Sequence, residues 1–266
     1  MPAIQPARLR QQAVLLAERV TDPAAYVRNL HFLMNFYADR ARRPGQSGKP
    51  GPLITAYKVR PPVLRIILQE TLPEALKDPE KGFSLCDALW DEPYLEFRML
   101  AAMLLGQLPT GAEEAVTRRL QAWLTPNLEE HLVTALLTQA AYNLRQESPQ
   151  TLVDMVQNWM ESKDTFYQQV GLRALLTLIE DPNFENLPAF YLMLQPLVRK
   201  VPSVLRADLL DALAALVKRS PQETAYFLRQ TLGTPNATDT AWLIRQTLTE
   251  FPTELRNSLR ETVRGL

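Results

Sequence analysis

Hydrophobic residues recur along the chain with the period of an α-helix. Residues 205–217 show the spacing i, i+4, i+5, i+8, i+11, i+12, which keeps their leucines on one stripe of a helix. Residues 97–108 show the same kind of stripe, made of Phe97, Leu100, Ala101, Leu104, Leu105 and Leu108. No comparable stretch alternates with period two, so the sequence predicts an all-α fold of about fourteen helices and no sheet.

The starts of several predicted helices carry recognisable signals. Asp22, Ser148 and Ser220 each stand directly before a proline, and such pairs place a capping oxygen ahead of the first helical residue. Asn127, followed three residues later by Glu130, has the spacing of a capping box. Most joining segments are only a few residues long, as helix hairpins require.

The predicted helices also repeat as pairs. A shorter helix ends at intervals of 33, 36, 41 and 32 residues, near Trp90, Trp123, Trp159, Lys200 and Leu232, and a longer amphipathic helix follows each end. One pair cannot bury its apolar face alone, so neighbouring pairs must stack. The sequence predicts a right-handed superhelical stack of antiparallel helix pairs, a HEAT/ARM-like α-solenoid, with a concave groove suited to binding.

We expect residues 1–266 to form a single HEAT-like repeat domain. Its predicted parts are an N-terminal helix pair at 1–41, a mobile basic loop at 42–57, a repeat core at 58–232, and an extra repeat or cap at 233–266. The loop is expected because Gly, Pro and basic residues gather there.

Composition restricts the possible chemistry. The chain of 266 residues is 46% hydrophobic and 22% charged, which is ordinary for a folded protein. With one cysteine and two histidines, a classical zinc site or an internal disulfide is not expected, and no nucleotide-binding or metalloprotease motif predicts a cofactor. No apolar run is long enough to span a membrane and no signal peptide is recognisable, so a cytoplasmic location without membrane association is the expectation.

Charge is unevenly distributed although the net charge is zero. Residues 1–65 contain eleven Lys or Arg and only three acids, so this quarter of the chain is strongly basic. The best cluster of cations, which could hold several DNA phosphates, consists of Arg40, Arg42, Arg43, Lys49, Lys58 and Arg60. A solvated helix end and loop would explain the same residues. Tyr57 lies among them and could stack on a base or anchor the loop.

Other conspicuous residues are expected to be structural. Trp90, Trp123 and Trp159 recur at the same point of successive repeats, which favours large rings packed between the repeats. His31 lies between apolar neighbours and is expected to be packed and hydrogen-bonded. Cys86 stands between leucines and is expected to be a small buried apolar residue.

Three segments follow recognisable sequence elements. The run Tyr57–Arg65 is similar to the element G-(V/I)-x-x-P-x-x-R. The run Leu85–Leu105 is similar to the element LW…(E/Y)-x-R-x-L-A. The run Asn158–Tyr167 joins a tryptophan, a turn and an aromatic residue. Together these segments resemble the DNA alkylation repair family of HEAT-like (AlkD-like) glycosylases, and the likeness extends roughly over residues 20–230.

This resemblance implies an activity and a site. The family hydrolyses the glycosidic bond of alkylated bases in duplex DNA, on a basic concave surface, with an aspartate beside tryptophans that stabilises the cationic sugar. In this sequence the Trp-Trp-Asp cluster falls near Glu130 and His131, and the aspartate position becomes Leu132. The arginine of the next repeat becomes Gln168 or Gln169.

Three hypotheses follow from these residues. The first is a protein that binds duplex or damaged DNA with weak or absent base excision. The second is a protein–protein interaction scaffold that uses the same groove, which the neutral net charge favours. The third is an active alkylpurine DNA glycosylase in which Glu130 is a relocated catalytic carboxylate, although an acid in the first turn of a helix more often complements the helix dipole.

Overall fold

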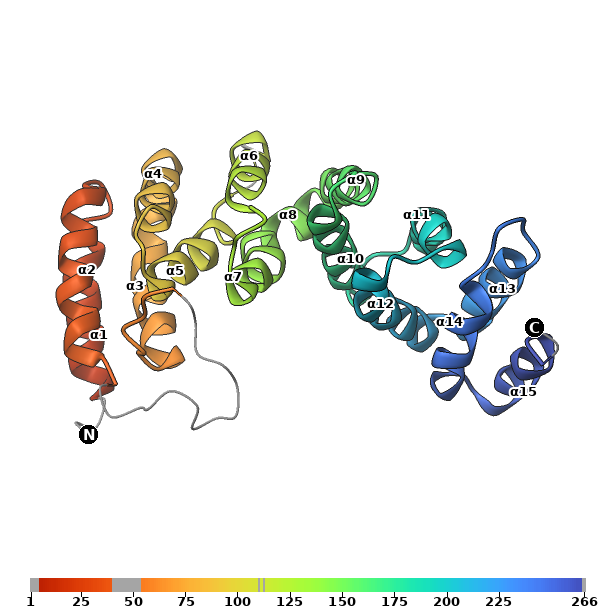
Figure 1. Ribbon diagram of the computed structural model, residues 1–266. Helices are drawn as coiled ribbons and strands as arrows, with labels where there is room; N and C mark the ends of the chain where they lie inside the picture. Colours follow the sequence, from red (N-terminus) through yellow and green to blue (C-terminus); the bar gives the residue numbers. More distant parts are fainter. Residues whose placement is uncertain (1–4, 40–53, 110, 112, 265–266) are drawn as a thin grey trace. The chain divides into compact units, whose positions relative to one another are not determined.

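The computed structural model describes residues 5–39, 54–109, 111 and 113–264. Within these residues the chain is all-helical, with fifteen α-helices, short 3-10 and π segments, and no β-strand (Figure 1). The all-α prediction is confirmed, and the number of helices is close to the fourteen expected. The arrangement is consistent with an α-solenoid, while the predicted hand of the superhelix stays a prediction.

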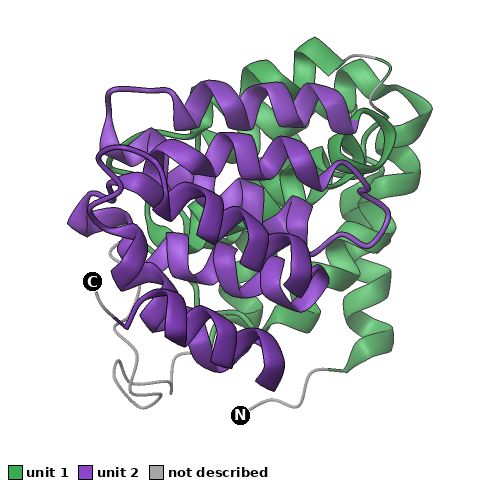
Figure 2. Cartoon of the chain, turned by 90° about the vertical axis from the view of Figure 1, so that its right-hand side faces the viewer, with its two compact units in different colours: residues 1–148 green, residues 149–266 purple. Residues whose placement is uncertain are grey.

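The chain divides into two compact units, residues 1–148 and 149–266, which are coloured separately in Figure 2. The elements of unit 1 are α1 (Pro6–Ala17), α2 (Pro23–Tyr37), α3 (Pro61–Lys77), α4 (Pro79–Trp90), α5 (Leu95–Leu105), α6 (Glu113–Trp123), α7 (Glu130–Ala135), the π-helix η2 (Leu136–Ala140) and α8 (Tyr142–Glu147). Those of unit 2 are α9 (Pro149–Met160), α10 (Thr165–Ile179), α11 (Leu187–Arg199), η3 (Ser203–Leu205), α12 (Arg206–Arg219), α13 (Pro221–Leu232), α14 (Thr240–Thr247), η4 (Leu248–Glu250) and α15 (Thr253–Thr262).

Within each unit, helices pack on the next-but-one helix along the chain, which gives two rows. In unit 1, α1 packs on α3, α3 on α5, and α5 on α7 and η2, while α2 packs on α4. In unit 2, α10 packs on α12 and α12 on α14, while α11 packs on α13 and α13 on α15. This is the packing that stacked helix pairs require, because each pair covers the apolar face of its neighbour.

The core follows the stripes read from the sequence. The six apolar residues predicted to share one stripe between 97 and 108 are each 0% exposed. Trp90, Trp123, Trp159 and Cys86 are buried, as expected. The rings of Trp90 and Trp123 stack with centroids 4.4 Å apart and planes 7° apart, so the recurring tryptophans of unit 1 do fill the space between successive pairs.

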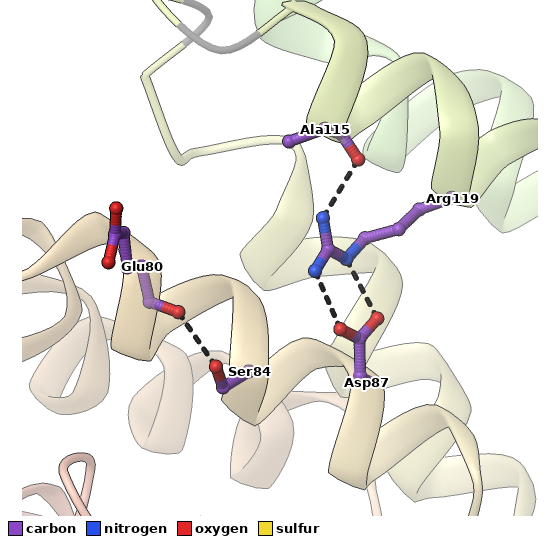
Figure 3. Close-up of polar contacts among 5 residues, drawn as sticks. All are labelled: Glu80, Ser84, Asp87, Ala115 and Arg119. Atoms are coloured by element: carbon purple, nitrogen blue, oxygen red, sulfur yellow. Dashed lines mark hydrogen bonds and ion pairs between the residues drawn. The ribbon is translucent and has the colours of Figure 1, made fainter.

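A buried arginine fixes α6 on α4. Arg119 donates from Nε to Asp87 Oδ1 at 2.7 Å and from Nη2 to Asp87 Oδ2 at 2.6 Å, and from Nη1 to the Ala115 carbonyl at 2.9 Å (Figure 3). Its guanidinium carbon lies 4.8 Å from the centre of the Phe83 ring. The Arg119 guanidinium is therefore bound to Asp87 inside unit 1, and this bidentate pair aligns α6 with α4.

The predicted helix starts are partly confirmed. Asp22 accepts a hydrogen bond from the Ala25 N–H at 3.0 Å, as a capping residue should. The prediction for Ser220 is wrong, since its side chain makes no capping hydrogen bond. Ser220 alone joins α12 to α13, and its N–H donates to the Leu216 carbonyl at the end of α12. The capping box at Asn127 is wrong as well, because a turn from Thr125 to Leu128 shifts the N-cap of α7 to Glu129.

The C-terminal segment is ordered in its described residues. It forms α14, η4 and α15; α14 and α15 pack on α13, and η4 packs on α12. Asp239 Oδ2 accepts from the Val201 N–H at 2.9 Å, and Thr240 Oγ1 donates to the Val198 carbonyl at 2.8 Å. These bonds hold the start of α14 against the end of α11. Whether this segment acts as an extra repeat or as a cap stays a prediction, as do the other domain boundaries.

Candidate nucleic-acid interface

A short extended segment, Thr55–Arg60, crosses the N-terminal end of α5; we call it the strap. The Leu95 N–H donates to the Thr55 carbonyl at 2.9 Å, and Thr55 forms an isolated β-bridge with Tyr94. The strap leads directly into α3, which begins with Pro61 and Pro62. Proline fixes the backbone at this point, so the direction in which the strap enters α3 is set locally.

Glu96, in the first turn of α5, holds the strap. Its carboxylate accepts from the N–H groups of Tyr57 at 3.0 Å, Lys58 at 2.6 Å and Val59 at 3.3 Å. The residue is only 5% exposed. Burial of a carboxylate is costly unless hydrogen bonds replace its water, and three backbone donors supply that replacement. The strap is therefore fixed to α5 through its backbone.

Lys58 has an unusual backbone conformation, with a φ of 59° in the left-handed region. In the family element G-(V/I)-x-x-P-x-x-R, this is the position of the glycine, which adopts such a φ without steric cost. A lysine here is strained by about 1–2 kcal/mol. The conformation persists because the Lys58 N–H makes the shortest of the three bonds to Glu96.

Arg98, of the second element (Leu85–Leu105), lies two residues after Glu96; we call the strap, Glu96, Arg98 and the turn after α4 the strap junction. Arg98 donates from Nε to the carbonyls of Trp90 and Glu92, both at 3.0 Å, and lies 5.5 Å from the centre of the Trp90 ring. It thereby satisfies the carbonyl of the last residue of α4 and a carbonyl of the turn that follows, neither of which has a partner within the helix. Glu96 of the second element thus fixes the strap, which carries the start of the first element, and Arg98 fixes the turn within the second element itself. The sequence element contains both residues, but its pattern does not show which main-chain groups they bind.

Tyr57 belongs to a polar and aromatic cluster on the strap. Its hydroxyl lies 2.8 Å from His31 Nδ1, and His31 Nε2 lies 3.1 Å from Glu92 Oε2. The Tyr57 ring stacks on Tyr94, with centroids 4.7 Å apart. The expectation that His31 is packed and hydrogen-bonded is confirmed. One face of the Tyr57 ring is covered by Tyr94. The contacts of Tyr57 are therefore those of a residue that anchors its segment, which was one of the two expected roles.

The surroundings of Tyr57 keep its phenol protonated. Burial raises its pKa to about 12, and the neighbouring Tyr94 and the carboxylates of Glu92 and Glu96 act in the same direction. A protonated phenol can donate to His31 Nδ1, which leaves Nε2–H to donate to Glu92; this assignment follows from the hydrogen-bond network. The cluster suits anchoring and does not activate the phenol as a nucleophile.

Two of the six predicted phosphate-binding cations lie on the strap. Lys58 and Arg60 are exposed, and Arg60 is the residue before α3. The other four predicted residues lie outside the described part of the chain: Arg40, Arg42, Arg43 and Lys49. The structure therefore brings Lys58 and Arg60 together on one fixed segment.

The positions that the resemblance assigned to catalysis have other environments. Leu132 is 0% exposed in the core of unit 1. In unit 2, Gln168 donates to the Ser162 carbonyl at 2.9 Å, and Gln169 donates to Asp208 at 2.9 Å. Glu130 is exposed and is the first residue of α7, where its negative charge interacts favourably with the positive end of the helix dipole.

Among the described residues, no group of three or more His, Cys, Asp and Glu side chains could hold a metal ion. The helices of the described residues are all too short or too polar to cross a membrane.

The fold and the strap junction define a helical-repeat protein with two interlocked sequence elements. Residues 54–250 match the family model described as DNA alkylation repair enzyme. Because the match covers well over half of the chain, the protein belongs to this family, which connects it with DNA repair. The matched segment begins at the strap. Neither the curated proteins nor the solved structures contain a significant match to the chain.

Proposed function

We propose that the protein binds duplex DNA, including damaged DNA, through the strap, and that its base-excision activity is weak or absent. Lys58 and Arg60 carry the proposal: both are exposed on a segment whose backbone is held by a buried carboxylate. Membership of the DNA alkylation repair enzyme family supports a nucleic-acid ligand. The concave binding face that the family resemblance implies is part of the proposal.

The fixed backbone of the strap suits phosphate binding. Each cation that neutralises a phosphate releases counterions, so affinity falls steeply as salt rises. Phosphate contacts position a protein on a duplex without reading its sequence. Two cations on a pre-ordered segment lose less conformational freedom on binding than two cations on a disordered chain. The strap would therefore position the duplex, while selection of damage would depend on other contacts.

Reduced excision follows from the side chains at the altered positions. Cleavage of a glycosidic bond develops positive charge on the sugar, which a carboxylate stabilises. A buried leucine at residue 132 offers no charge, and Gln169 already contacts Asp208. These residues support weak or absent activity of the familiar kind. Glu130 stays an alternative candidate for the missing carboxylate, since it is exposed near Leu132 in sequence.

Fluorescence anisotropy tests the binding. A labelled duplex with a tetrahydrofuran abasic mimic is compared with an unmodified duplex at low and moderate salt. We expect salt-sensitive binding that prefers the lesion, and about tenfold weaker binding by Lys58→Gln/Arg60→Gln, because both phosphate contacts are lost. The matched control, Lys81→Gln/Lys163→Gln, removes the same charge from exposed sites elsewhere and should bind nearly as wild type.

Equal loss of affinity in the two double variants would contradict the strap as the binding site, and absence of binding at low salt would contradict DNA binding altogether.

Release of methylated purines is measured on the same duplexes. We expect little or none from the wild type. Substantial release abolished by Glu130→Gln would support the relocated carboxylate and would contradict the proposed weak excision.

A further inference from the structure

The first helix pair of unit 1 has an unusually apolar surface. Across the described chain, large apolar side chains with substantial exposure are few, and four of them lie on α1 and α2: Val14 at 43%, Leu15 at 62%, Phe32 at 76% and Phe36 at 50%. Exposed apolar residues scattered singly need no explanation, whereas a cluster on one face marks an interaction site.

A hollow of about 480 Å³ runs between these two helices; we call it the α1–α2 groove. On α2, the lining residues Asn29, Phe32, Leu33 and Phe36 form a complete i, i+3, i+4, i+7 stripe. On α1 the lining residues are Gln12, Leu15 and Leu16, and Glu18 and Arg19 of the turn after α1 complete the lining. Leu16 and Leu33 form a buried floor, at 4% and 7% exposure, and the exposed Leu15, Phe32 and Phe36 form the walls.

The geometry of the groove fits a helix. Helices pack by placing the side-chain ridge of one into the groove of another, and within unit 1 the opposite faces of α1 and α2 are covered in this way by α3 and α4. The α1–α2 groove offers the same kind of surface, without a covering helix from the described residues of unit 1. An amphipathic helix would fill it with apolar residues at helical spacing.

Charges on the rim indicate the polar face of that helix. Arg19 and the acid Glu18 both line the groove, and the guanidinium of Arg8 lies 5.0 Å from the centre of the Phe36 ring. Arg10 is paired with Glu70 of α3, with Nε 3.1 Å from Oε1, and the remaining cations Arg8, Arg19 and Arg28 outnumber the acids Glu18 and Asp22. A second copy of the chain would bring two basic surfaces together, which costs electrostatic energy, whereas acidic residues beside an apolar stripe would be attracted.

We propose that the α1–α2 groove binds an amphipathic helix of a protein partner whose polar flanks are acidic. The leucine floor and phenylalanine walls receive its apolar stripe, and Arg8 and Arg19 face its acidic flank. The strap takes no part in this site, so the proposal does not depend on DNA binding and would survive the loss of that function.

A displayed library of helices of about 18 residues tests the groove, because that length supports a stable amphipathic helix. The helices carry Leu or Phe at i, i+4 and i+7 and randomised polar positions, and selection uses the full chain. We expect enrichment of sequences with acidic flanks. An enriched synthetic peptide should bind at least tenfold more weakly to Phe32→Ser/Phe36→Ser, because its apolar anchors lose their walls.

The control variant Leu192→Ser/Tyr226→Ser removes apolar groups that are 72% and 63% exposed in unit 2, and should bind the peptide as wild type does. Arg8→Glu/Arg19→Glu should weaken binding of the acidic peptide. Three results would overturn the proposal: no enrichment on wild type beyond that on Phe32→Ser/Phe36→Ser, enrichment of basic flanks, or a wild-type dimer in sedimentation velocity that Phe32→Ser/Phe36→Ser dissociates.

Discussion

The strap junction and the segment around α7 carry two parts of one family pattern, and they differ in what their residues contact. At the junction, the buried Glu96 binds three backbone N–H groups and Arg98 binds two carbonyls. Around α7, Leu132 is part of the core and Glu130 faces solvent. The side chains that hold the strap and the turn after α4 are therefore present, whereas the position assigned to chemistry contributes to packing.

The difference teaches that a family pattern can describe structure and chemistry separately. Glu96 and Arg98 satisfy main-chain groups, and replacement by an apolar residue would leave those groups without partners. A catalytic carboxylate has no such structural duty, so its replacement by leucine is compatible with the fold. Four experiments would break or sharpen this comparison.

The largest effect is expected where the π-helix after α7 meets α5. A Cβ added to Gly106 would lie 1.7 Å from the Gln139 carbonyl oxygen and 2.8 Å from its carbon. Gly106→Ala should therefore destabilise the chain by at least about 3 kcal/mol, since backbone rather than a flexible side chain must move. Urea-induced unfolding of the full chain measures the loss. Gly233→Ala is the control, because its nearest atoms would lie 3.6 and 3.9 Å away; equal losses would show that the α7 region is not a tightly seated packing element.

The next effect tests the junction itself. Glu96→Gln replaces an acceptor of three N–H groups by an amide that keeps one oxygen and adds a donor, and should cost about 2–4 kcal/mol. The amides of Tyr57, Lys58 and Val59 should also lose protection in hydrogen exchange. Glu80→Ala serves as a control, since Glu80 is exposed and the Ser84 hydroxyl bonds only its main-chain carbonyl (Figure 3). Unchanged exchange in Glu96→Gln would contradict the role of Glu96 as the anchor of the strap.

A smaller effect is expected at Lys58. Lys58→Gly should relieve the strain of a positive φ, and the greater freedom of glycine in the unfolded chain offsets part of this, which leaves a gain within about 1 kcal/mol. Lys58→Val should be destabilising, because a branched side chain tolerates this φ least. The difference between the two unfolding free energies is the measurement. Equal stabilities would mean that the left-handed conformation is not maintained in solution.

The smallest effect concerns the phenol of Tyr57. Its pKa is raised to about 12 from an ordinary value of 10.0, so the folded state keeps the proton to a higher pH than the unfolded state. The contribution to stability is complete below pH 10 and is lost as the pH rises towards 12. Ultraviolet titration should show that Tyr57→Phe removes a tyrosine transition above pH 11. If Tyr57→Phe instead removes a transition near pH 10, the pKa of Tyr57 is not raised, and the cluster around Tyr57 is more open to water than its contacts indicate.

The sequence by itself determined the helical character, the buried stripe between 97 and 108, the burial of the recurring tryptophans, and the family. These features follow from local periodicity, because a residue's place on a helix face depends on its neighbours in sequence. Cap positions were less predictable: Asp22 acts as expected, whereas Ser220 and Asn127 do not, since a one-residue connection and an intervening turn changed their geometry.

Only the tertiary structure decided how residues far apart in sequence share their hydrogen bonds. The bond from the Lys58 N–H to Glu96 joins residues 38 positions apart, and no local pattern shows which carboxylate will accept it. The same holds for Tyr57, which could have stacked on a base but packs on Tyr94 in the folded chain. The exposure of the apolar walls of the α1–α2 groove was also decided by the tertiary structure, because periodicity marks an apolar stripe without showing whether another helix covers it.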